Sequence, residues 1–139
     1  MEQLKALYED YAQKALEVRQ KARPFDGIMG LGDDPKNHPC HEAFYLAVKE
    51  WAEAFAAAKP SPEEANEAIS FLIETPAHSR EQECYWFMYA CMVCMDPLIP
   101  YLNNTYAKAL AKRMNFLFPR YDRMPAHRAV YKKLQQAGK

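Results

Sequence analysis

The segment CYWFMYACMVCM, residues 84–95, decides the fold class of this chain. It places twelve apolar residues in a row, whereas a helix that crosses a membrane needs about twenty. An apolar helix that is too short to cross a membrane has to be surrounded by protein. The segment therefore predicts a buried helix over about residues 80–95, at the centre of a hydrophobic core.

Outside this segment, apolar residues recur at helical spacing, which is typical of amphipathic helices. The clearest helix start is the capping-box pattern of Ser61 and Glu64, with Pro62 at the first helical position. No stretch shows the alternation expected of a strand. Short connections between the second, third and fourth helices favour an antiparallel order. We predict an all-α protein, a five- to six-helix antiparallel bundle forming one domain over residues 1–139. Besides the central helix, the predicted helices cover about residues 2–23, 39–58, 61–75, 96–118 and 125–137.

The stretch 24–39 interrupts this helical pattern. It contains three of the chain's four glycines, together with three aspartates and Asn37, which predicts a long loop. A solvated loop has no need of large apolar side chains, so those in the middle of this one either pack onto the bundle or form a partner-binding patch. The residues concerned are Ile28, Met29 and Leu31.

The bulk composition is that of an ordinary globular protein. Half of the residues are apolar and 26% are charged, with a net charge of zero. No basic stretch leads into an apolar signal segment, so we expect a cytoplasmic protein with no membrane contact. Three of the four cysteines lie in the apolar segment 84–95, which predicts buried, reduced thiols and no disulfide framework.

The zero net charge conceals a strong asymmetry. Residues 1–100 contain 9 basic and 17 acidic side chains, whereas residues 101–139 contain 9 basic and 1 acidic. Aromatic residues lie among the basic ones, a combination typical of nucleic-acid binding, and Lys108, Lys112 and Arg113 are the candidate contacts. We instead expect the basic third to meet acidic surface of the first hundred residues, within one chain or between two copies.

The sharpest chemical motif is His38-Pro39-Cys40-His41 at the start of the second helix. Antiparallel helices place this motif at the same end of the bundle as His78 and Cys84. Thiolate and imidazole groups are the ligands that zinc prefers. A structural zinc site formed by Cys40, His41, His78 and Cys84 is therefore one hypothesis for this chain.

Catalytic templates fit the sequence poorly. The Glu-x-x-His and His-Glu-x-x-His spacings of di-iron and zinc enzymes do not occur. Two of the three serines, Ser61 and Ser79, are predicted helix caps. The sequence therefore favours a non-enzymatic helical interaction or scaffolding module without a cofactor, which binds a protein partner or a second copy of itself. The alternatives are the zinc-supported domain and a nucleic-acid-binding protein.

Overall fold

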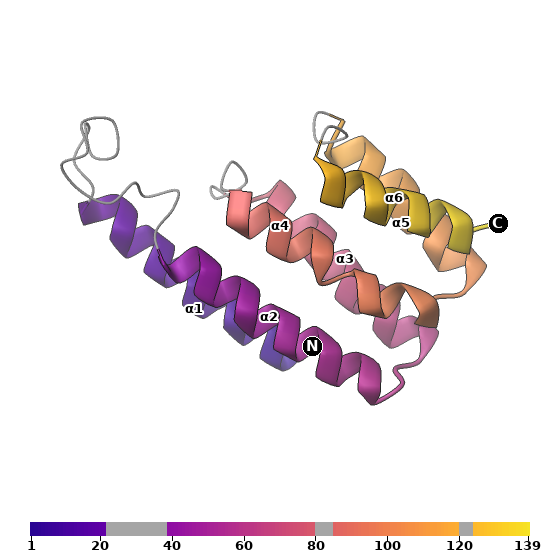
Figure 1. Cartoon of the computed structure of the whole chain (residues 1–139), viewed down its shortest axis with the longest axis horizontal. Helices are drawn as coiled ribbons and strands as arrows, with labels where there is room; N and C mark the ends of the chain where they lie inside the picture. Colours follow the sequence, from indigo (N-terminus) through magenta and orange to yellow (C-terminus); the bar gives the residue numbers. More distant parts are fainter. Residues whose placement is uncertain (22–38, 80–84, 120–123) are drawn as a thin grey trace.

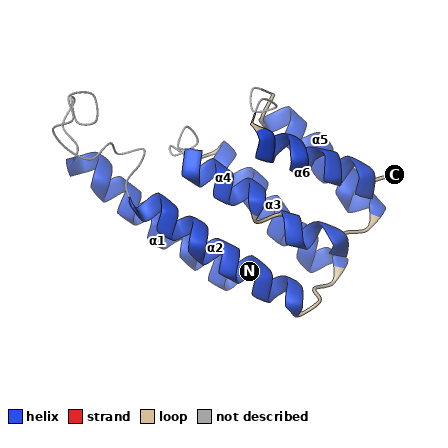
Figure 2. Cartoon of the chain, in the orientation of Figure 1, coloured by secondary structure: helices blue, strands red, loops and turns tan. Residues whose placement is uncertain are grey.

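The computed structural model describes residues 1–21, 39–79, 85–119 and 124–139. In these parts of the chain every regular element is helical, and no strand is present there (Figure 2). The predicted all-α class is therefore confirmed. The elements are α1 (Glu2–Lys21), α2 (Pro39–Ala57), α3 (Pro62–Ala77), α4 (Tyr85–Val93), the 3-10 helix η2 (Asp96–Tyr101), α5 (Asn104–Leu117) and α6 (Pro125–Ala137).

The helices form three antiparallel pairs that lie side by side, α1 with α2, α3 with α4, and α5 with α6 (Figure 1). Helix α4 packs between α2 and α6 in one layer, and α3 packs against α5 in the other. The antiparallel order predicted from the short connections is confirmed. The bundle is thus a stack of three helical hairpins, with the α1/α2 hairpin at one end and the α5/α6 hairpin at the other.

Helix α4 lies at the centre of this stack and contacts α2, α3 and α6. None of the described helices combines the length and apolarity that a membrane crossing requires. One side of α4 forms the outer surface of its layer, and Trp86, Tyr89 and Val93 on that side are half-buried. Its other side chains confirm the predicted core helix, since five of them are almost fully buried: Phe87, Met88, Ala90, Cys91 and Met92.

Aromatic rings connect α4 to the first hairpin. The ring of Tyr11 on α1 stacks against Phe44 of α2, at 4.5 Å, and against Phe87 of α4, at 5.0 Å, and the rings of Phe44 and Phe87 lie 5.6 Å apart. Stacked aromatic pairs add to the free energy that area burial alone provides. This cluster of three rings joins α1, α2 and α4.

Prolines account for two of the differences between the observed helices and those predicted. The fifth helix does not begin at Asp96, because Pro100 lacks the N–H group that an α-helix interior requires. The chain forms η2 there instead, and α5 begins only at Asn104. Helix α3, by contrast, continues past Thr75 and includes Pro76 in its last turn.

Candidate functional site

The residues of the hypothetical zinc site have separate surroundings where the structure describes them. The buried His41 ring lies with Nδ1 2.8 Å from the Tyr11 hydroxyl. His78 is exposed, and its Nε2 lies 3.3 Å from a carboxylate oxygen of Glu74. Cys84 lies outside the described residues, as does His38. Among the described side chains, no three His, Cys, Asp or Glu residues gather as a metal site. The four-residue zinc site therefore stays a prediction.

The candidate partner-binding residues Ile28, Met29 and Leu31 also lie outside the described residues, so their role stays a prediction.

The predicted contact between the basic C-terminal third and the acidic first hundred residues is confirmed at two places. The Arg113 guanidinium of α5 binds both carboxylate oxygens of Glu74 on α3.

This contact lowers the pKa of the Glu74 carboxyl, because the charged form accepts the hydrogen bonds. At the second place, the Lys133 ammonium of α6 contacts Asp96 of η2. Both ion pairs tie the last hairpin to the preceding part of the stack.

Four other basic residues of the last hairpin are exposed. Lys108 and Lys112 lie on the side of α5 opposite its buried Leu110 and Met114. Arg128 and Lys132 lie in the same way opposite the buried stripe of α6. We call these four residues the basic end face, because each is exposed on the side of its helix opposite the buried residues.

The aromatic residues of the C-terminal third are not equivalent. Phe118 is buried, whereas Phe116 is 74% exposed. The Arg113 guanidinium lies over the Phe116 ring, 5.6 Å from the centre of that ring. Tyr101 and Tyr106 are half-buried. Only Phe116 is therefore available as a stacking surface among the described members of this group.

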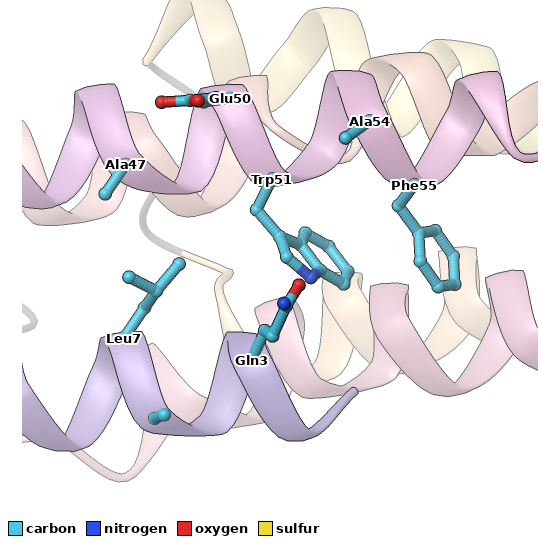
Figure 3. A pocket seen from close by; sticks show the side chains of 8 residues that line it. Gln3, Leu7, Ala47, Glu50, Trp51, Ala54 and Phe55 are labelled. Carbon is cyan, nitrogen blue, oxygen red and sulfur yellow. The ribbon is translucent and has the colours of Figure 1, made fainter.

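An open groove lies between α1 and α2, in the hairpin at the opposite end of the stack from α5 and α6. Figure 3 shows Trp51 and Phe55 projecting from α2 toward α1, and Gln3 and Leu7 projecting from α1 toward α2. The hollow beside Trp51 and Phe55 has a volume of about 620 Å³. Its lining residues are Gln3, Ala6, Leu7, Ala47, Glu50, Trp51, Ala54 and Phe55.

A second hollow continues the first toward the start of α2, because both are lined by Leu7 and Ala47. It has a volume of about 480 Å³ and is lined in addition by Asp10, Tyr11, Lys14, Pro39, Cys40, Ala43 and Phe44. We call the two together the α1–α2 groove.

The floor of the α1–α2 groove is apolar and its charges are few. Asp10 and Lys14 form an ion pair at 2.9 Å, and the hydrogen bond and charge of Asp10 raise the pKa of Lys14. Glu50 is exposed beside the alanines of α2. Leu46, one turn from Glu50, is 57% exposed, which is unusual for a large aliphatic side chain.

The sequence patterns did not reveal this groove, although one signal for it was present. Helix α2 contains four charged residues among nineteen, fewer than a helix with one solvated face normally carries. Alanines at positions 43, 47 and 54 take the place of polar residues on its outer side. Alanine is compatible with both exposed and buried positions, so this pattern is ambiguous without the tertiary structure.

The fold defines a stack of helical hairpins with an open apolar groove in the hairpin at one end and exposed cations on the hairpin at the other. Comparisons of the chain with protein-family models, with curated proteins and with solved structures found no match. A function for this chain therefore has to be inferred from the chemistry of the α1/α2 and α5/α6 hairpins.

Proposed function

We propose that this protein is a non-enzymatic helical interaction module that binds one helix of a protein partner in the α1–α2 groove. The observation that carries the proposal is the apolar, open groove on the outer side of the end hairpin. Stacks of helical units normally end in a unit with a polar outer face, because that face meets water. The α1/α2 hairpin departs from this rule only in the α1–α2 groove, where apolar surface stays open between the exposed polar residues of α1 and the exposed charged residues of α2.

The shape of the groove supports a helix as the occupant. Ala43, Ala47 and Ala54 are small, and small side chains allow a neighbouring helix backbone to approach closely. Phe55 is half-buried and Trp51 is only 8% exposed, so Phe55 provides most of the accessible aromatic surface, which is of the kind that dominates binding free energy in protein interfaces. A docked helix would continue the side-by-side packing of α2, α4 and α6 by one more position.

Charge defines the partner further. Lys14 already neutralises Asp10, whereas Glu50 is exposed at the apolar surface. A partner helix with apolar residues at three- and four-residue spacing and a lysine or arginine beside them would complement both features.

Selection from a phage-displayed library of helix-forming peptides tests this proposal. Wild-type protein should enrich amphipathic, basic helices, and an Ala54→Arg substitution should weaken their binding at least tenfold, because the arginine fills the groove. Ala109→Arg is the matched control, since Ala109 is an exposed helical alanine on α5. Selected helices that bind the Ala54→Arg variant as well as the wild type would contradict the proposal.

The predicted self-association can be tested with the same variants. If sedimentation shows a dimer that Ala54→Arg dissociates and Ala109→Arg does not, the helix in the groove belongs to a second copy of the chain. A dimer unaffected by Ala54→Arg would place self-association at another surface.

A further inference from the structure

The basic end face consists of cations without acidic neighbours in either of its helices. The sequences of α5 and α6 contain no aspartate or glutamate. Arg113 and Lys133 are paired with Glu74 and Asp96 on preceding elements. The four cations of the basic end face are exposed, and no acidic residue of α5 or α6 neighbours them.

The spacing of these four cations places like charges next to each other on both helices. Lys108 and Lys112 are four residues apart on α5, and Arg128 and Lys132 are four apart on α6, so each pair places like charges on neighbouring turns. Like charges at this spacing destabilise a helix. Helix α1 shows the ordinary pattern, in which Asp10 and Lys14 form an ion pair at the same spacing. A ligand with negative charge would offset this repulsion in both helices.

The one strongly exposed aromatic ring of the described chain continues this cationic surface. Phe116 follows Lys112 by four residues, on the next turn of α5, and its side chain is 74% exposed. Neighbouring cations combined with an exposed aromatic ring are the elements that bind single-stranded nucleic acids, since the cations contact phosphates and the ring stacks on a base.

We propose that the basic end face, together with Phe116, binds the phosphate backbone and one base of single-stranded nucleic acid. This surface is separate from the α1–α2 groove, so the two binding activities are independent. A double helix fits less well, because its bases are already stacked on one another and offer no free face to Phe116.

Fluorescence anisotropy with a labelled twelve-nucleotide oligothymidylate and an oligouridylate of the same length tests the proposal. Four phosphate contacts on a single strand predict that affinity falls about 50-fold between 50 and 200 mM salt. The double variant Lys112→Glu/Lys132→Glu should weaken binding at least tenfold at 50 mM salt. Phe116→Ala should weaken binding about fivefold or more and leave the salt dependence unchanged, because it removes a stacking contact and no charge.

The matched control is the double variant Lys5→Glu/Lys21→Glu, which makes the same change in net charge at exposed positions of α1. It should bind within about threefold of the wild type. The neutral pair Lys112→Gln/Lys132→Gln should also lose affinity, and circular dichroism checks that each variant is folded. Ala54→Arg should bind the oligonucleotides normally.

Three results would overturn the proposal. The first is that the wild-type protein binds neither oligonucleotide at 50 mM salt. Binding to phosphatidylserine vesicles without binding to the oligonucleotides would count as this result. Another is equal loss of affinity in the α1 control, which would make the attraction a matter of net charge. The third is Phe116→Ala binding as well as wild type, which would exclude base stacking.

Discussion

His41 illustrates how the surroundings of a residue decide its chemistry. Together with its neighbour Cys40, it suggested a metal site, because both side chains can bind zinc. In the structure its ring lies in the core with Nδ1 beside the Tyr11 hydroxyl, a partner thirty residues away in the sequence. Buried polar groups are normally hydrogen-bonded, and this contact meets that requirement.

Cys91 and Cys94 also resemble a metal-binding or redox pair, but their thiols are buried. Burial raises the pKa of Cys91 well above its usual range, and the neighbouring Cys94 adds to this effect. Burial also raises the pKa of Cys94, to about 12. Because the thiolate is the reactive form, both side chains are chemically inert in the folded protein at neutral pH.

These pKa values predict that the protein loses stability at high pH. Above about pH 9 the two thiols ionise in the unfolded chain, where their pKa is about 8.5, and stay protonated in the folded one. The unfolded state then binds fewer protons, so the free energy of unfolding falls as pH rises. Cys94 alone should account for about 1 kcal/mol between pH 9 and 10.

Urea denaturation of the wild type and of Cys94→Ala at both pH values measures this effect. Between the two pH values, the free energy of unfolding of Cys94→Ala should fall by about 1 kcal/mol less than that of the wild type. Lysines and tyrosines also ionise in this pH range, but they affect both proteins equally. Equal declines would show that the Cys94 thiol ionises in the folded state. Thiol-reactive reagents should label Cys91 and Cys94 rapidly only after unfolding.

At the scale of single elements, local interactions fix the helix starts. Ser61 and Glu64 form the reciprocal capping box, with the Glu64 N–H 3.1 Å from the serine hydroxyl and the Ser61 N–H 3.0 Å from the glutamate. The hydrogen bonds from Ser61 lower the pKa of Glu64, since they favour its charged form. Asn103 likewise caps α5 by accepting a hydrogen bond from the Tyr106 N–H at 2.8 Å.

The capping box predicts the effect of two substitutions at Ser61. Ser61→Ala should lower the free energy of unfolding by about 1 kcal/mol, because the N–H group of Glu64 loses its acceptor. Ser61→Asp should retain most of the stability, since aspartate is an equally good cap. Urea denaturation of the three proteins provides the comparison. A Ser61→Ala variant as stable as the wild type would show that this cap contributes nothing to α3.

At the scale of the whole molecule, the stack gives its hairpins unequal surroundings. The α3/α4 hairpin packs against a neighbour on each side, whereas the α1/α2 and α5/α6 hairpins each have a neighbour on one side. Local opening costs most where buried contacts are densest. The central hairpin should therefore open only when the whole domain unfolds.

Hydrogen exchange followed by mass spectrometry tests this order. Amides of residues 87–92 in α4 should exchange most slowly, at the rate set by global unfolding, and amides of α1 and α6 should exchange earlier. Measurements at two pH values provide the control, because exchange limited by an opening equilibrium accelerates about tenfold per pH unit. Amides of α1 that exchange as slowly as those of α4 would indicate that the end hairpin is covered in solution, as a partner helix or a second copy would cover it.

The sequence by itself determined the helical class, the positions of most helices and the core helix. Periodic apolar residues, prolines and caps act over a few residues, so their effects can be predicted locally. The segment 84–95 predicted the centre of the core, and Ser61 predicted the start of α3. At Pro100 a local rule was present as well, but the run of apolar residues around it concealed the break between η2 and α5.

Only the tertiary structure decided what the two ends of the stack offer. The alanines of α2 become a groove because α1 lies beside them and no further helix covers them in the described structure. The basic residues of α5 and α6 divide into Arg113 and Lys133, which meet acids, and four that face outward. Both outcomes depend on which helix packs against which, and such contacts join residues far apart in the sequence. Spacing along the chain therefore cannot distinguish an alanine or a lysine at a binding surface from one that merely faces water.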